Sequence, residues 1–213
     1  STDPRVHDLA ACLFALRARQ GLTADEAQRL ASDPLMFATW LLRIGAVDAS
    51  VAGAVRVTAD VIRFALWLIG PAEGVRTVSS AFYICLPARH DGVAGAADEE
   101  VLTYTDCAVV PQPSAEQLAD IALAAAEARR RIVGDEPRVA FLSYSSRGSG
   151  GSGGSIDLVR EALRLVRLRD PLLAADGELQ GDAALDPSVA ARKAPGSALG
   201  GRANVLVFPS LDA

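Results

Sequence analysis

The chain has 213 residues and a formal net charge of −5; 50% of its residues are hydrophobic and 22% are charged. This composition is typical of a soluble globular protein with one large domain or two small ones, and its acidic balance argues against nucleic acid or an anionic membrane as the main partner. Three widely spaced cysteines favour a reduced, cytoplasmic setting over a disulfide framework, and the presence of only two histidines argues against a zinc site. The most apolar run, 61–69, is too short to cross a bilayer.

Helical signals dominate the first third of the chain. Thr23 and Glu26 form a T-x-x-E capping box, and Asp33 before Pro34 is typical of an N-cap followed by proline at the first helical position. Thr58 is the expected N-cap of a further helix with an apolar face. We therefore predict helices at 9–20, 23–31, 34–44 and 58–69, and a buried strand at 50–55.

From residue 77 onwards, strand and helix patterns alternate. Two runs of β-branched and aromatic residues, 77–86 and 101–110, flank the polar stretch 90–100 and predict a long hairpin. The alternation that follows indicates a mostly parallel sheet covered on both faces. Its predicted helices are 114–131, 156–168 and 187–193, and its predicted strands are 139–145, 172–175 and 203–208.

We place a domain boundary near residue 78. Residues 1–78 then form a mainly helical part of a first α/β domain, and residues 79–213 form a second α/β domain that begins with the hairpin. The last predicted strand is not followed by the helix that a βα unit would place over it. We therefore interpret the chain as truncated.

One candidate phosphate site lies at the predicted helix start. Free N–H groups in the first turn after Thr58 would favour a phosphate, and Arg63 follows about one turn later. Asp60 weakens this interpretation, because a carboxylate in the first turn already complements the helix dipole. The alternative is an ordinary helix start with a solvated arginine.

A second candidate is the Gly- and Ser-rich stretch 143–155, between a predicted strand and a predicted helix. Its N–H groups and Arg147 could form an anion nest, and a flexible connector is an equal alternative. A P-loop is excluded because the stretch contains no lysine. A G-x-S-x-G match at 150–154 has no histidine after it, since His90 is the last one, and this excludes a serine hydrolase.

Two further groups of residues are interpreted as structural. Four carboxylates cluster late in the chain and would be able to hold Mg²⁺, but their spacing matches no Ca²⁺-binding loop, and solvated turn residues are the favoured interpretation. These are Asp176, Glu178, Asp182 and Asp186. Trp40 and Trp67 lie on apolar helical faces, where we expect core positions.

Several motifs, in order along nearly the whole chain, resemble those of the phosphotransacetylase family of phosphate acetyltransferases and butyryltransferases. The resemblance implies two three-layer αβα domains with mostly parallel sheets, similar to the isocitrate and isopropylmalate dehydrogenases, truncation at both ends of this chain, and a homodimer. The motifs are DPLMF at 33–37, VAGA at 51–54, TADVIR at 58–63, TVSS at 77–80, SYSSRGS at 143–149 and DGELQ at 176–180.

The resemblance also implies a reaction: acetyl-CoA + phosphate = CoA + acetyl phosphate, by direct thiolate attack, with coenzyme A as a substrate and with no cofactor or metal. The family's general base and catalytic arginine are expected beyond Ala213, so we assign no catalytic residue and expect the isolated chain to be inactive. Substrate- or coenzyme A-binding roles carry over to Arg17, Thr58, Arg63, Ser79, Ser145, Ser146, Arg147, Gly148 and Ser149.

Three positions depart from the family pattern. Arg56 replaces a usual histidine, Phe64 a usual proline, and the pair at 49–50 a usual Asp-Gly. The departures at Arg56 and at 49–50 motivate a first alternative, an acetyl-CoA-sensing, oligomerising domain like the one that some malic enzymes carry at their C-terminus. A phosphate butyryltransferase, which differs in the size of its acyl pocket, is the second alternative.

Overall fold

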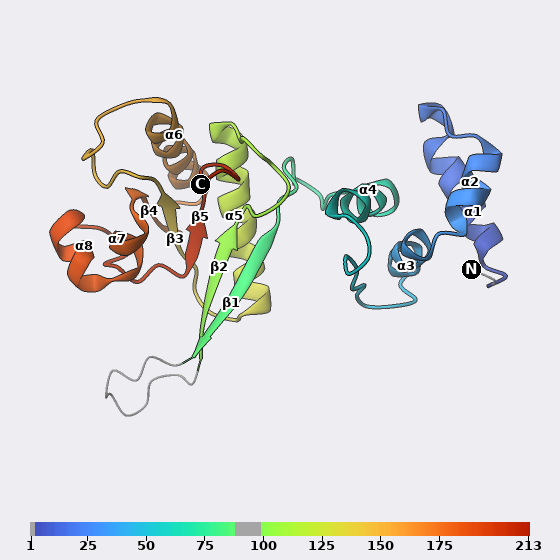
Figure 1. Ribbon diagram of the computed structural model, residues 1–213, viewed down its shortest axis with the longest axis horizontal. Coiled ribbons are helices and arrows are strands. Elements are labelled where there is room, and N and C mark those ends of the chain that lie inside the picture. Colours follow the sequence, from blue (N-terminus) through green and yellow to red (C-terminus); the bar gives the residue numbers. More distant parts are fainter. Residues whose placement is uncertain (1–2, 88–98) are drawn as a thin grey trace. The chain divides into compact units, whose positions relative to one another are not determined.

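The computed structural model describes residues 3–87 and 99–213, and the chain divides into two compact units, Ser1–Gly74 and Val75–Ala213 (Figure 1). Each unit has its own hydrophobic core. We describe the units separately, as unit 1 and unit 2.

In the described part of unit 1, all regular secondary structure is helical. The predicted caps are confirmed: Thr23 and Glu26 form a reciprocal capping box, and the Asp33 side chain accepts hydrogen bonds from the backbone N–H groups of Leu35 and Met36. The helices pack around a core that includes Leu9, Leu13, Met36, Trp40, Phe64 and Leu68. They are α1 (Val6–Arg17), the 3₁₀ turn η1 (Ala18–Gln20), α2 (Ala24–Ala31), α3 (Pro34–Arg43) and α4 (Thr58–Leu68).

Two predictions between α3 and α4 are wrong. The expected buried strand at 50–55 is irregular chain: the side chains of Val51 and Val55 are 100% and 93% exposed. A strand needs a partner for its backbone groups, and the described part of unit 1 contains no other strand to pair with. Thr58 is the first helical residue and not the cap; Val57 occupies the N-cap position, with no side-chain capping bond.

Unit 2 is built on a five-stranded sheet with the order β1-β2-β5-β3-β4. β1 and β2 form an antiparallel pair, which confirms the predicted hairpin, although most of its polar stretch 90–100 lies outside the described residues. The other three pairings are parallel, as predicted. The strands are β1 (Ala81–Pro87), β2 (Glu99–Thr105), β3 (Arg138–Leu142), β4 (Ala174–Leu179) and β5 (Val205–Val207).

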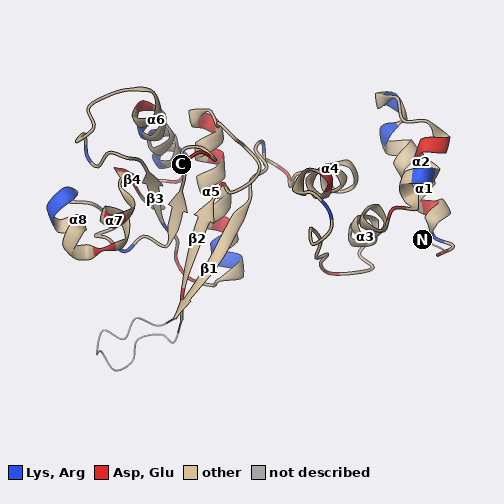
Figure 2. Cartoon of the chain, viewed as in Figure 1, with Lys and Arg blue, Asp and Glu red and all other residues tan. Residues whose placement is uncertain are grey.

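Helices cover both faces of this sheet and complete a three-layer unit. Alternate residues of β3 point to opposite faces: Val139 and Phe141 pack against α5 (Ala115–Ile132) and α6 (Gly154–Arg169), whereas Ala140 packs beside α7 (Gly181–Leu185). The short helix α8 (Pro187–Lys193) follows α7. Acidic residues in the first turn of α5 and basic residues in its last turn complement the helix dipole (Figure 2).

The fourth strand differs from its prediction at 172–175, because β4 runs through Asp176 and Glu178 to Leu179. Both acidic side chains are buried, with exposures of 0% and 2%, so their interpretation as solvated turn residues is wrong. Acidic residues normally disfavour strands, and here arginines from other elements neutralise them. Among the described residues, no helix is long and apolar enough to cross a membrane.

Candidate functional site

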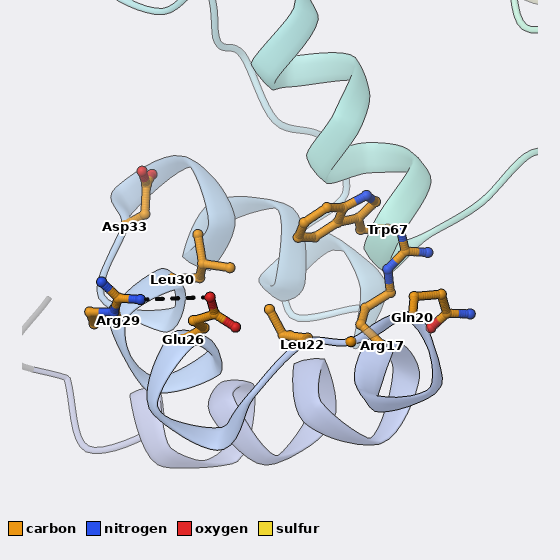
Figure 3. A pocket seen from close by; sticks show the side chains of 9 residues that line it. Arg17, Gln20, Leu22, Glu26, Arg29, Leu30, Asp33 and Trp67 are labelled. Carbon is orange, nitrogen blue, oxygen red and sulfur yellow. Dashed lines mark ion pairs between the residues drawn. The ribbon is translucent and has the colours of Figure 1, made fainter.

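Unit 1 contains a cavity of about 540 Å³ whose lining combines two arginines and two acidic residues, Glu26 and Asp33, with apolar and aromatic surface. Arg17 at the end of α1 lies over the ring of Trp67 on α4, with 4.6 Å between the guanidinium carbon and the ring centroid (Figure 3). Arg29 on α2 forms an ion pair with Glu26, 3.9 Å apart, on another part of the wall. An arginine on an aromatic face and a second arginine nearby suit a ligand that carries both phosphate groups and a planar ring.

Local sequence explains how Arg17 reaches this cavity. The 3₁₀ turn after α1 ends at Gly21, which adopts a left-handed conformation (φ 93°) that favours glycine. The chain then reverses into α2, so that Leu22 and Leu30 also line the cavity. Arg17 therefore lies at a sharp corner, where its side chain is free to project across the helix end towards α4.

The second predicted arginine, Arg63, also lies on α4. It is one helical turn before Trp67, and residues four apart share a helix face. Its guanidinium forms an ion pair with Asp60 and lies 5.6 Å from the centroid of the Phe64 ring. Thr58 begins the same helix, but neither Thr58 nor Arg63 is among the residues that line the cavity; Arg17 contacts this helix at Trp67, beyond the TADVIR motif.

Trp67 and Arg29 line the cavity in unit 1, and sequence reasoning missed both. Trp40 is buried in the core as predicted, but Trp67 is only partly buried and lines the cavity. The available signal was its spacing of four residues from Arg63 on an amphipathic helix. Arg56, one of the departures from the family pattern, forms an ion pair with Asp33 at the N-cap of α3.

In unit 2, the candidate residues gather along one edge of the sheet. The register pairs Ala81 at the start of β1 with Thr105 at the end of β2, and Thr105 with Val207 at the end of β5. Ser79 and Ser80, just before β1, therefore lie at the edge where the parallel strands have their carboxyl ends. Ligands of open α/β sheets bind at this edge.

A buried carboxylate holds Ser80 and the chain that follows β2. Asp106 accepts hydrogen bonds from the Ser80 hydroxyl (2.6 Å) and from the backbone N–H groups of Ser80 and Val110 (3.0 and 2.7 Å). Burial alone would raise the pKa of Asp106, but these hydrogen bonds outweigh it and the pKa is lowered. These hydrogen bonds to Asp106 engage Ser80, which leaves Ser79 as the candidate ligand contact of the pair.

The 143–155 stretch lies at the same edge and is bonded internally. Ser145 and Ser146 are buried, and their hydroxyls contact Glu178 and Gln180. The Ser149 hydroxyl accepts from the Ser146 N–H at 3.0 Å. Ser145 and Ser146 shape the loop from inside, which favours neither a flexible connector nor direct exposure of their hydroxyls to a ligand, whereas Ser149 is exposed.

The positive groups of the loop also have internal partners. The guanidinium of Arg147 donates to the buried Asp176 at 2.6 Å, and the Gly148 N–H donates to Glu178 at 2.7 Å. Burial would raise the pKa of Glu178, but hydrogen bonds, first from Arg160 and then from the Gly148 N–H, lower it to about 2. The Gly148 N–H and the Arg147 guanidinium, which the sequence placed in a candidate anion nest, therefore each bind one of the protein's own carboxylates.

A cavity of about 450 Å³ opens beside this loop. Its lining includes Ser143, Tyr144 and Ser155 from the loop and Phe208 and Ser210 from the chain after β5. The Tyr144 side chain is 66% exposed, in contrast to the buried serine that follows it. Ser143, Tyr144 and Ser155 belong to the candidate stretch 143–155, whereas Phe208 and Ser210 were not predicted as ligand contacts. Among the described residues, no cluster of three His, Cys, Asp or Glu side chains could hold a metal ion.

Comparison with known proteins identifies the family of this chain. Residues 1–213 match the family model described as phosphate acetyl/butaryl transferase. The chain is 43% identical over 211 residues to a phosphate acetyltransferase from Clostridium acetobutylicum, covering 99% of this chain and 62% of that protein. It is 46% identical over 210 residues to a phosphate acetyltransferase from Paracoccus denitrificans, covering 98% and 64% of the two chains.

A solved structure gives the same result for the fold. A phosphotransacetylase from Streptococcus pyogenes superimposes with a TM-score of 0.81 and 34% identity, covering 98% of this chain and 60% of that one. The chain thus spans somewhat under two thirds of the length of these relatives. The family resemblance and the α/β fold predicted from the motifs are confirmed.

Proposed function

Because this chain belongs to the phosphate acetyl/butaryl transferase family, we propose that its protein exchanges an acetyl group between coenzyme A and phosphate. The observation that carries the proposal is the match of residues 1–213 to that family. The chain spans only part of its relatives, so this activity is an inference for the whole protein.

Unit 1 supplies features that suit coenzyme A. Its nucleotide end carries phosphates and an adenine ring, and the cavity offers guanidinium groups at Arg17 and Arg29 beside the aromatic face of Trp67. A guanidinium binds phosphate oxygens in a fork geometry, and aromatic faces stack on planar rings. We assign Arg17 and Arg63 to this substrate, with Thr58 at the start of the same helix.

Unit 2 supplies features that suit the smaller substrate. Phosphate or acetyl phosphate needs hydrogen-bond donors in a pocket of limited size, and the cavity at the carboxyl edge is lined by the hydroxyl-bearing residues Ser143, Tyr144, Ser155 and Ser210, together with Asp212 and apolar residues. Ser79 lies at the same edge of the sheet. We assign the loop residues Ser145, Ser146, Arg147, Gly148 and Ser149 to the support of this cavity.

The reaction that we propose is direct acyl transfer. The coenzyme A thiolate attacks the carbonyl carbon of acetyl phosphate, a C–S bond forms, the C–O bond to phosphate breaks, and phosphate leaves with the bonding electron pair. The thiol proton passes to a general base, and positive charge or N–H donors must stabilise the developing oxyanion. The contribution of this chain is to bind and orient the two substrates.

We further propose a cytoplasmic homodimer. The three cysteines, Cys12, Cys85 and Cys107, are free, which is compatible with a reducing compartment. Size-exclusion chromatography with light scattering tests the dimer.

The activity is tested with the protein purified from its full reading frame. We expect phosphate-dependent conversion of acetyl-CoA to free coenzyme A, and arsenate-dependent breakdown of acetyl-CoA. Butyryl-CoA, assayed in parallel, decides the acyl preference. Binding of acetyl-CoA without any turnover would contradict the proposal and would support the acetyl-CoA-sensing domain instead.

A further inference from the structure

A single buried side chain, Glu178 on β4, is bonded to the loop at the carboxyl edge of the sheet from several directions. Its Oε1 accepts hydrogen bonds from the Gly148 N–H (2.7 Å) and the Ser145 hydroxyl (3.1 Å). Its backbone carbonyl accepts from the Arg147 N–H at 3.2 Å. The Ser145 hydroxyl in turn accepts from the Gly150 N–H at 2.9 Å. The hydrogen bonds of Glu178 and of Ser145 together therefore extend from position 145 to position 150 of the loop.

Arg160 on α6 supplies the charge that keeps this carboxylate in place. Its Nε donates to Glu178 Oε2 at 2.9 Å, and its Nη2 donates to Oε1 at 3.1 Å. Both oxygens are therefore occupied, and the ionised group is satisfied although only 2% of the residue is exposed. Hydrogen bonds through Glu178 thus connect the loop to α6, which covers one face of the sheet.

These hydrogen bonds stabilise a strained backbone conformation in the loop. Arg147 has φ 49°, in the left-handed region that non-glycine residues seldom occupy, and Gly148 follows with φ 87°. The side chain of Arg147 is held by the buried Asp176, which also accepts from the Ser197 hydroxyl at 2.6 Å. Two buried carboxylates therefore support the same turn from β4.

The outer side of the same loop faces the cavity that we assign to the phosphate-bearing substrate. Ser143, Tyr144 and Ser155 line that cavity, whereas Ser145 and Gly148 point inward to Glu178. Inward and outward groups alternate over a few residues, so a change in the loop's shape would move the cavity wall. Glu178 itself is not among the residues that line this cavity.

We propose that Glu178 is a positioning residue, whose carboxylate holds the 143–151 loop in the shape that binds the phosphate-bearing substrate. The inference rests on the proposed function for the identity of that substrate. The role of Glu178 in shaping the loop stands on the hydrogen bonds alone.

The test compares Glu178→Gln with Glu161→Gln in the full-length protein. Glutamine keeps the size of the side chain, but its NH₂ group faces the donors of Arg160. Glu161 forms its ion pair with Arg164 on the exposed face of α6, the helix that carries Arg160, so it is a matched control. The readouts are hydrogen–deuterium exchange of peptides covering 143–151 and the KM values for phosphate and for coenzyme A.

In Glu178→Gln we expect exchange in 143–151 to accelerate about tenfold and KM for phosphate to rise about tenfold, because a buried acceptor is weakened. KM for coenzyme A should stay within about twofold, since the residues that we assign to it lie in unit 1. Glu161→Gln should change neither. A folded Glu178→Gln protein with wild-type loop exchange and wild-type KM for phosphate would overturn the proposal.

Two outcomes separate this inference from the proposed function. If the wild-type protein shows no acyl transfer, the proposed function fails, and the exchange experiment still decides whether Glu178 shapes the loop. If Glu178→Gln does not fold, Ser145→Ala replaces it: loss of the hydroxyl should accelerate exchange of the Gly150 amide, and unchanged exchange there would overturn the proposal.

Discussion

Arg17 and Trp67 form a cation–π pair in which the guanidinium carbon lies 4.6 Å from the ring centroid. The two residues come from α1 and α4, the first and last helices of unit 1. Arg17 was expected at a substrate site from the family resemblance, and Trp67 was expected in the core. Their contact makes Trp67 part of the surface that we assign to coenzyme A.

Replacement of Trp67 should therefore weaken coenzyme A binding. We expect Trp67→Leu to raise KM for coenzyme A about three- to tenfold, because a cation–π contact contributes about 0.5–2 kcal/mol. KM for phosphate should not change. Trp40→Phe is the control: Trp40 is buried in the same core, so its replacement should lower stability and leave both KM values unchanged. An equal rise in KM in both variants would contradict this assignment.

Glu178 should make the stability of the protein depend on pH in a defined direction. Its pKa falls from an ordinary 4.5 to about 2 in the fold. Because the folded value is the lower one, the ionised carboxylate stabilises the fold above pH 4.5, and this contribution is lost as the pH falls towards 2. Urea unfolding of wild type and Glu178→Gln should differ by a constant free energy from about pH 6 to 8, and the difference should shrink below the ordinary pKa. A difference that stays constant down to pH 3 would contradict the assignment.

Alanine should lower the stability of the protein when it replaces Gly150 of the 143–155 loop, but not when it replaces Gly154. A Cβ at Gly150 would lie 2.9 Å from both the Ser145 Cβ and the Tyr144 ring, so Gly150→Ala should destabilise by about 1–3 kcal/mol. A Cβ at Gly154, the first residue of α6, meets nothing within 4 Å. Gly154→Ala should be neutral or should stabilise by up to about 1 kcal/mol. Equal tolerance in thermal unfolding would favour the flexible connector.

Arg129 should be essential for the stability of unit 2. Its side chain is 2% exposed and donates to Asp135, to the Thr103 hydroxyl and to the Asn204 carbonyl, linking α5 to β2 and to the start of β5. Arg129→Met should lower the free energy of unfolding by about 3–5 kcal/mol, because it leaves buried acceptors unpaired. Arg131, also in the last turn of α5, forms an exposed pair with Glu127, and Arg131→Met should change stability by less than about 1 kcal/mol. Similar denaturation midpoints for the two variants would show that the buried network is dispensable.

Features that depend on nearby residues could be predicted from the sequence. The capping box at Thr23, the N-cap at Asp33, the β1–β2 hairpin and the parallel order of the later strands follow from spacing and composition along the chain. The predicted strand at 50–55 is wrong because a strand also depends on a distant partner, and local propensity does not supply one.

The family and the general fold class were thus determined by the sequence itself, because the motifs and their order along the chain can be recognised without any knowledge of tertiary contacts. The roles of individual side chains were decided only by the tertiary structure. The sequence favoured a solvated turn position for Glu178. In the structure its carboxylate is bound by Arg160, 18 residues earlier, and by Ser145, 33 residues earlier. Whether a carboxylate is solvated or buried depends on which donors the fold brings within hydrogen-bond distance, and no local pattern records that distance.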